Sequence, residues 1–233
     1  MKKDIAIVGI GGTSRDIVDA LEAQNDRNPT WNIVGFFDDN PELTGQKPLG
    51  YPILGALSSL NRREFDKVSV VIGVANERQL FVRREISHRI GIGPERYPTI
   101  IHPAATISKH AQLGAGTVLL SGAFCSNGVV LGNHVIILQN TIVGHDSHLA
   151  DFVSVSANVA IAGGVQVEEG AYLGIACSVL PLRKIGRGAL VGSGCVVTRD
   201  VPAEAVVFGN PGRIIAVGES QERHSNGDQV KDT

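Results

Sequence analysis

The segment 140–148, NTIVGHDSH, holds the residues best suited to acid–base chemistry. A histidine such as His145 can accept a proton near neutral pH because the unperturbed pKa of imidazole is about 6.5. Asp146 follows directly, and a carboxylate at that place could orient the ring and stabilise the imidazolium form. The segment therefore predicts a general base at His145, with a solvated turn histidine as the alternative.

His110, His134 and His148 are the other histidines near turns, and we expect each to be a solvated turn residue without a catalytic role. A zinc site is a further alternative, since three histidines that converge between subunits could hold the metal. His145 and His148 are the candidates, but the sequence offers no obvious third ligand. We therefore predict no metal site.

A glycine-rich turn follows the apolar run IAIVG at residues 5–9. Gly9, Gly11 and Gly12 could expose backbone N–H groups to a phosphate at the start of a helix. The complete dinucleotide fingerprint requires a third glycine where this chain has Ser14. A nucleotide or nucleotide-sugar site is the favoured interpretation. A nicotinamide cofactor site and a packing turn without a ligand are the alternatives.

Asp38 and Asp39 follow the second apolar run, IVGFF at residues 33–37. This position is close to where a ribose contact falls in a dinucleotide-binding domain. Two adjacent carboxylates repel each other, and such pairs usually mark a site or a capped turn. The pair therefore supports a ligand site at which a carboxylate holds a hydroxyl or amino group.

The element that must position His145 is a repeat with a period of six residues. Every sixth residue over 101–197 is apolar, in 17 of 17 positions: Ile101, Ile107, Leu113, Leu119, Cys125, Leu131, Ile137, Val143, Leu149, Val155, Ile161, Val167, Leu173, Val179, Ile185, Val191 and Val197. A small or β-branched residue lies two positions before each of them, and only Arg183 breaks this second series. This period is typical of a parallel β-helix, in which three hexapeptides form one triangular coil. The apolar residues then fill the column inside the coils, and His145 faces outward from a bend.

A different pattern precedes the repeat. Strands are expected at 5–9, 33–37 and 68–75, with helices at 14–23 and 77–90. Alternating strands and helices predict a small α/β domain with a parallel sheet. We therefore expect a Rossmann-like domain over 1–98, a β-helix over 99–217 and a disordered, polar tail over 218–233.

Composition limits the partners of the chain. Its net charge of −2 argues against nucleic acid as the main partner. The chain contains no apolar run of membrane-spanning length, so no membrane contact is expected.

Cys125, Cys177 and Cys195 fall on inward or corner positions of the repeat, so we expect small core residues rather than disulfides or metal ligands. This cysteine usage fits a cytoplasmic protein.

Residues 4–215 resemble the NeuD/PglD-type sugar acetyltransferase family. The matching pieces are IAIVGIGG, GFFDDN, YPILG, HPAATI, NTIVGHD, AGGVQV, GIACSVLP and FGNPGRII. The resemblance implies a Rossmann-like domain joined to a left-handed β-helix and assembly into a homotrimer. It also implies transfer of an acetyl group from acetyl-CoA to nucleotide-linked amino sugars or sialic acids.

The resemblance implies a role for each matching position. His145 resembles the general base, Asp146 its acidic neighbour, and Gly163 the backbone N–H that would stabilise an oxyanion. The positions that resemble the nucleotide-sugar site are Gly11, Gly12, Thr13, Asp38 and Asp39. A groove for acetyl-CoA between neighbouring subunits would include Ser154, Gly174, Arg183, Val191, Gly209, Asn210 and Pro211.

Three positions depart from the family pattern. Thr13 stands where the family usually has a histidine, and Ser154 stands in place of a second histidine of the active coil. Arg183 occupies a corner that usually takes a small or apolar residue, where it could contact a phosphate of CoA. The resemblance thus implies an acetyl-CoA-dependent N-acetyltransferase that acts on a nucleotide-activated 4-amino-deoxysugar for surface glycan or lipopolysaccharide synthesis. The alternatives are O-acetylation of a sugar hydroxyl and a non-catalytic nucleotide-binding scaffold.

Overall fold

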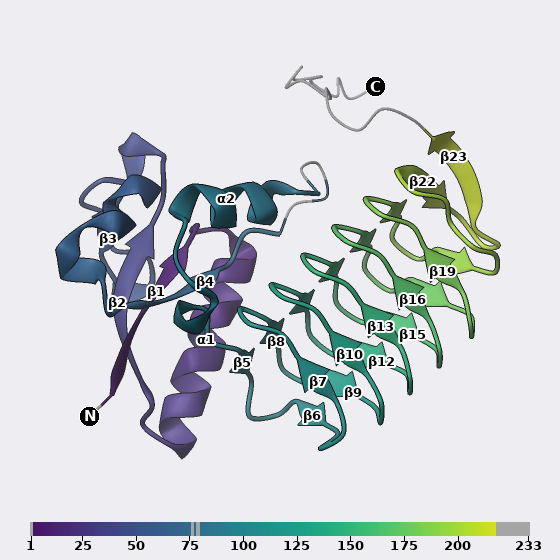
Figure 1. Cartoon of the computed structure of the whole chain (residues 1–233), viewed down its shortest axis with the longest axis horizontal. Helices are drawn as coiled ribbons and strands as arrows, with labels where there is room; N and C mark the ends of the chain where they lie inside the picture. Colours follow the sequence, from purple (N-terminus) through teal and green to yellow (C-terminus); the bar gives the residue numbers. More distant parts are fainter. Residues whose placement is uncertain (1, 76, 78–79, 218–233) are drawn as a thin grey trace, which may run out of the picture.

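The chain folds into an α/β domain followed by a rod of stacked triangular coils (Figure 1). The structure is a computed structural model that describes residues 2–75, 77 and 80–217. The predicted tail, 218–233, therefore lies outside the described residues. None of the helices in the described ranges is long and apolar enough to cross a membrane.

Four parallel strands form the sheet of the N-terminal domain, in the order β3-β2-β1-β4. The strands are β1 Lys3–Val8, β2 Trp31–Phe37, β3 Ile53–Gly55 and β4 Ser69–Ile72. The helices are α1 Gly12–Arg27 and α2 Val82–Ile90, with short 3-10 helices η1 Pro41–Leu43, η2 Pro48–Gly50, η3 Leu57–Asn61, η4 Arg63–Phe65 and η5 Pro94–Arg96. The predicted parallel α/β domain is confirmed.

The elements of this domain differ in length from those that the sequence predicts. Helix α1 is longer than 14–23 because it starts immediately after the glycine turn and continues through polar residues to Arg27. Helix α2 begins at Val82 instead of 77, since Phe81 before it is non-helical. Strand β3 was not expected, because it has three residues that are only half-buried and leave no apolar run.

The rod has three parallel sheets, which we call faces 1, 2 and 3. Face 1 contains β5 Ile100–Ile101, β8 Val118–Leu119, β11 Ile136–Ile137, β14 Ser154–Val155, β17 Tyr172–Leu173, β20 Leu190–Val191, β22 Ala205–Phe208 and the antiparallel β23 Arg213–Val217. Face 2 contains β6 Thr106–Ile107, β9 Phe124–Cys125, β12 Ile142–Val143, β15 Ala160–Ile161, β18 Ser178–Val179 and β21 Val196–Val197. Face 3 contains β7 Gln112–Leu113, β10 Val130–Leu131, β13 His148–Leu149, β16 Gln166–Val167 and β19 Lys184–Ile185.

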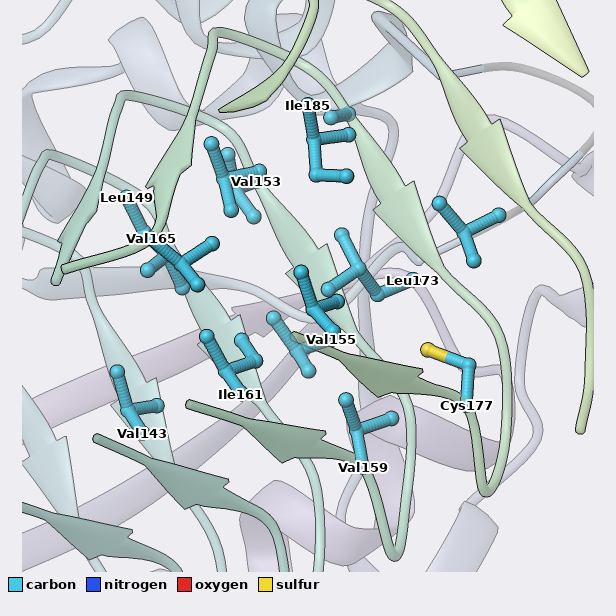
Figure 2. Packing of buried hydrophobic residues seen from close by; sticks show 14 of the residues in the cluster. Val143, Leu149, Val153, Val155, Val159, Ile161, Val165, Leu173, Cys177 and Ile185 are labelled. Atoms are coloured by element: carbon cyan, nitrogen blue, oxygen red, sulfur yellow. The ribbon is translucent and has the colours of Figure 1, made fainter. Parts of the chain in front are cut away.

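From β5 to β18, each strand of the rod pairs with the strand 18 residues further along, as Val130 with His148 shows. The second residue of each two-residue strand is the apolar residue of the repeat, and these side chains point into one column (Figure 2). Val143, Leu149 and Leu173 are fully buried there. The predicted left-handed parallel β-helix is confirmed.

The three cysteines belong to this core. Cys125, Cys177 and Cys195 are buried and free. Burial raises the pKa of Cys125 and of Cys177 to about 12, so both stay protonated thiols at neutral pH. The prediction of small core residues is confirmed.

The N-terminal domain packs on face 1 near the beginning of the rod. Ile17 and Leu21 of α1 share a buried cluster with Ile100 of β5 and Ile136 of β11. The Nε2 of Gln24 also donates to the carbonyl of Ile101 at 2.7 Å. In a triangular coil the edge between faces 2 and 3 lies opposite face 1, so this edge points away from the docked domain.

Candidate active site

His145 lies at the edge between faces 2 and 3, in the bend that joins β12 to β13. Asp146 turns the chain with a positive φ of 57°, and its Oδ2 lies 2.8 Å from the Nδ1 of His145. Both side chains are exposed, by 69% and 73%. A proton held on Nδ1 by this carboxylate leaves Nε2 as the ring's acceptor, which is the arrangement of a general base.

Gly163 occupies the matching position of the next coil at the same edge. A Cβ at residue 163 would overlap the Nε2 of His145, so the imidazole lies in space that only a glycine leaves open. The neighbouring N–H groups of Ala162 and Gly164 donate to the carbonyls of Val179 and His145. Within the described part of the chain, the N–H of Gly163 has no backbone acceptor. A donor with no partner beside a base can stabilise a developing oxyanion.

The glycine turn of the N-terminal domain forms the start of α1. Gly11 is the N-cap, and no described side chain hydrogen bonds to the N–H groups of the first turn. A Cβ at Gly11 or at Gly12 would meet no atom within 4 Å, so the turn is open. Thr13 lies in the first turn and is half-buried. An open helix N-terminus with unoccupied N–H groups can bind a phosphate.

The acidic pair divides into two different environments. Asp38 Oδ1 accepts from the N–H of Asn40 at 2.9 Å, which forms a local turn. Asp39 accepts from the N–H of Leu57 at 2.9 Å and from Arg89 at 2.7 Å. The Leu57 N–H, together with Arg89, holds the pKa of Asp39 below its usual value. Both oxygens of Asp39 therefore already have partners, whereas Asp38 is the freer carboxylate.

Most of the residues predicted for the acetyl-CoA groove border face 2. The turn at Gly209, Asn210 and Pro211 closes the end of this face, where the N–H of Val196 donates to the carbonyl of Gly209. Gly174 lies at the bend that follows β17, on the border of faces 1 and 2. Arg183 lies at the other border, with its guanidinium 3.5 Å from Asp200.

Two residues of the predicted groove lie elsewhere. Ser154 is 7% exposed in β14, on face 1, away from the edge that carries His145. The side chain of Val191 is fully buried in the central column, so only its backbone could meet a ligand. The structure thus brings His145, Asp146 and Gly163 together, as the prediction of catalytic residues requires, but it separates Ser154 from them.

The expectation for the other histidines was wrong for His134 and for His148. His134 is 6% exposed, because it stacks on Phe152 at 5.1 Å and meets the edge of Tyr97 at 4.6 Å under the N-terminal domain. Burial lowers the pKa of His134 to about 4, with nearby Arg83 adding to the effect. His148 is exposed but belongs to β13 rather than to a turn.

Arg83, which the sequence patterns did not single out, is 2% exposed at the interface between the domain and the rod. A signal for it exists in the sequence. Arg83, Ile86 and Ile90 follow a helical spacing, so an arginine stands on the apolar face of α2.

Among the described residues, no group of three or more His, Cys, Asp or Glu side chains could hold a metal ion.

Comparisons with known proteins agree with the two-domain arrangement. Residues 4–90 match the family described as the PglD N-terminal domain. The UDP-N-acetylbacillosamine N-acetyltransferase of Bacillus subtilis is 34% identical over 120 residues, which is 51% of this chain and 52% of that one. The chain spans only 33%, 49% and 52% of the length of three curated relatives that it matches.

Two solved structures match nearly the whole chain. The acetyltransferase domain of PglB from Neisseria gonorrhoeae has a TM-score of 0.82 at 27% identity, over 92% of this chain and 100% of that one. Perosamine N-acetyltransferase from Caulobacter crescentus, solved with CoA and GDP-perosamine, has a TM-score of 0.81 at 26% identity, over 91% and 97% of the two chains. The resemblance that the sequence motifs indicate is confirmed.

Proposed function

We propose that this chain is an acetyl-CoA-dependent N-acetyltransferase that acts on the amino group of a nucleotide-activated 4-amino-deoxysugar. The observation that carries the proposal is the His145 ring, held by Asp146 and lying against Gly163, whose N–H has no acceptor among the described residues. A base and an oxyanion donor side by side are what transfer of an acyl group from a thioester needs. A second solved structure of the PglB domain carries acetyl-CoA. The perosamine N-acetyltransferase carries CoA and GDP-perosamine, a nucleotide-linked sugar.

The reaction balances without a covalent enzyme intermediate. The amine nitrogen attacks the thioester carbon, and its proton passes to Nε2 of His145 while Asp146 stabilises the imidazolium. The thioester oxygen gains negative charge, to which the N–H of Gly163 donates. The C–S bond then breaks, and the imidazolium returns the proton to the departing sulfur of CoA.

The nucleotide part of the acceptor would bind in the N-terminal domain. The first turn of α1, at Gly11, Gly12 and Thr13, offers N–H groups to the phosphates. Asp38, and to a lesser degree Asp39, lies at the end of β2, where a carboxylate can hold a hydroxyl or amino group of the ligand.

This assignment requires a second copy of the chain. The nucleotide domain covers face 1, whereas His145 lies at the opposite edge of the same rod. A sugar held by one copy would therefore react at His145 of a neighbouring copy, which agrees with the homotrimer that the resemblance implies. Exposed apolar side chains on face 2, Phe124 at 40% and Ile142 at 51%, are suited to a contact between copies.

Acetyl-CoA would lie along face 2. Its thioester would sit beside His145 and Gly163, and the CoA end would reach toward the Gly209–Pro211 turn, with Gly174 and Arg183 on the two borders. Val191 would contribute only its backbone to this groove, and Ser154, which is buried in β14 on face 1, would lie outside it.

Release of free thiol from acetyl-CoA tests the reaction, using a panel of UDP-, dTDP- and GDP-linked amino sugars beside their hydroxyl analogues. Release with an amino sugar supports the proposal. Release with hydroxyl sugars alone supports O-acetylation instead. Nucleotide binding without any thiol release would mean a non-catalytic scaffold.

A mixing experiment tests the shared site. Gly11→Asp places a carboxylate where phosphate would bind, yet Asp is a good N-cap, so α1 should still form. This variant is mixed in equal amounts with His145→Ala, and each should have little activity alone. If every site combines the domain of one copy with the histidine of another, random mixing in a closed ring restores about a quarter of the wild-type rate. Sites contained within one chain would restore none.

A further inference from the structure

Arg83 is a fully buried guanidinium whose described partners are all carbonyl oxygens. Nε donates to His134 at 3.3 Å, one terminal nitrogen donates to Val74 at 3.0 Å, and the other donates to Phe152. Burial lowers the pKa of Arg83 to about 10, so the side chain keeps its charge at neutral pH. Burying a charge away from water is costly, and only well-placed dipoles offset that cost.

Two of these carbonyls belong to successive bends of the rod, at the edge between faces 3 and 1. His134 and Phe152 both adopt positive φ, 54° and 62°, which turns the chain at the corner. The coil-to-coil ladder at this edge uses the preceding carbonyl, as the bond from the Phe152 N–H to Asn133 shows. Arg83 thus binds carbonyls at the corner that accept no hydrogen bond from the backbone of a neighbouring coil within the described residues.

The third carbonyl belongs to the glycine-turn region of the N-terminal domain. Val74 follows β4, and a Cβ at Gly9 would lie 2.7 Å from its side chain, so the Val74 segment packs directly on the turn. The hydroxyl of Ser14, in the first turn of α1, donates to the carbonyl of Gly73 at 3.2 Å. The segment that Arg83 holds therefore supports the first turn of α1.

We propose that Arg83 is a positioning residue that sets where the nucleotide-binding turn stands relative to the rod. The proposal rests on the proposed function, since its consequence is the alignment of the sugar amine with the catalytic edge. One side chain joins Val74 to two coils, so a shift of the domain on the rod would break all three hydrogen bonds together.

A second anchor next to Arg83 supports this role. Phe81 lies over the bends at Gly170 and Gly188, where a Cβ would collide with the ring or press closely on it. The guanidinium groups of Arg84 and Arg187 each lie 4.5 Å from the centre of this ring. Glu169 of the rod pairs with both arginines, at 3.4 and 3.2 Å. The start of α2 is thus fixed on the same edge of the rod.

The test compares two variants. Arg83→Met replaces the arginine with an apolar side chain of similar length, whereas Arg83→Lys keeps the positive charge but has fewer hydrogen-bond donors. Arg62→Met is the matched control, since Arg62 is an exposed arginine of the same domain. We expect kcat with the nucleotide-linked sugar to fall by roughly tenfold to a hundredfold in Arg83→Met, the usual effect of a small misplacement. The Kd values of the nucleotide sugar and of acetyl-CoA should stay within about twofold of wild type, and Arg83→Lys should recover part of kcat.

A matched acceptor separates positioning from damage to the fold. The same amino sugar without its nucleotide, at high concentration, does not use the N-terminal domain, so its slow acetylation should be unchanged in Arg83→Met. An unchanged kcat with the nucleotide sugar would overturn the proposal. An equal fall with both acceptors would also overturn it, because Arg83 would then only maintain the rod.

A distance measurement tests the proposal without activity. Spin labels on Lys67→Cys and Lys109→Cys, both exposed positions, report the distance between domain and rod, and the native cysteines are buried from the label. Labelled chains are diluted with unlabelled ones so that each assembly carries one pair. We expect the distance distribution to broaden in Arg83→Met and to be restored in part by Arg83→Lys. A distance distribution identical to that of the wild type in Arg83→Met refutes the positioning role. If Arg83→Met does not fold, the same result in Arg83→Lys refutes it. This outcome does not depend on whether the protein acetylates any of the sugars tested.

Discussion

The imidazole of His145 occupies the space where residue 163 would otherwise carry its side chain. The two residues lie one coil apart at the same edge of the rod, and the coils are joined there by the bond from the Gly164 N–H to the His145 carbonyl, at 2.8 Å. The rigid stacking of coils therefore fixes the distance between the proposed base and the proposed oxyanion donor, and no movement of a loop is needed to bring them together.

Gly163→Ala tests this contact. The added methyl group would overlap Nε2, so the ring must leave its place against the backbone. We expect kcat to fall by about tenfold to a thousandfold, within the range measured when one catalytic group is lost or misplaced. Thermal unfolding should change little, since the edge is exposed. A variant with normal kcat would show that the ring does not work from this position.

His145→Ala should lower kcat by roughly a hundredfold to ten-thousandfold, which is the usual contribution of a positioned proton acceptor. Asp146→Asn should have a smaller effect, since the ring stays but its orienting carboxylate is gone. Near-normal turnover of His145→Ala, measured as thiol release, would remove His145 from the mechanism.

Asp38→Asn and Asp39→Asn should differ. Asp38→Asn should weaken nucleotide-sugar binding by roughly tenfold to a hundredfold, the cost of losing a charged hydrogen bond. Asp39→Asn should also weaken this binding, but mainly by loosening the contacts to Leu57 and Arg89. Since the pKa of Asp39 is lowered in the fold, its contribution to stability is present at neutral pH and is lost as the pH falls through that lowered pKa.

Calorimetry with each ligand, together with thermal unfolding, checks these expectations for the acidic pair. Acetyl-CoA binding should stay nearly unchanged in both variants, because the two ligands are assigned to different domains. Equal loss of both affinities would mean that the pair is structural.

His134 should make the protein sensitive to acid. Its pKa is about 4 when folded and near 6.5 when unfolded, so the unfolded chain binds more protons between these values. The free energy of unfolding should therefore decrease as the pH falls from about 6.5 to about 4. His134→Phe keeps the stacking on Phe152 without the titrating group and should flatten this dependence. Parallel curves for wild type and His134→Phe in denaturant titrations would contradict the assignment.

Light scattering checks the assembly. The site proposed here needs the domain of one copy and the edge of another, so a closed threefold ring of about three times the 24.6 kDa chain mass is expected. A monomer at micromolar concentration would leave the sugar and His145 on opposite sides of one rod.

The rod could be predicted from sequence because its core repeats without interruption. A period of six residues belongs to one architecture, and it assigns Val143 to the core and His145 to a bend before any coordinate is known. Gly163 was indicated by the family resemblance, and its closeness to His145 agrees with the repeat, since matching positions recur every 18 residues. Asp146 was expected beside His145 because it follows it directly in the chain.

The docking of the two domains could not be predicted in this way. It depends on contacts between residues far apart in sequence, such as Phe81 on Gly170 and Arg83 on the bend at Phe152. The same contacts explain why His134 is buried although its bend alone would be solvated. For Ser154, the family pattern indicated a ligand contact. Its strand, β14, belongs to face 1, which lies opposite the edge that carries His145.

The unbroken stacking of coils also fixes distances along the rod in equal steps. Between the strand that precedes His145 and the Gly209–Pro211 turn, face 2 advances strand by strand through β15, β18 and β21, each step being about 4.8 Å. The reach available to a bound acyl donor is therefore counted in whole coils. Inserting one coil of 18 residues after β18 would leave His145 and Gly163 untouched while moving the far turn by one step. Donor length and chemistry can thus be altered independently in this architecture.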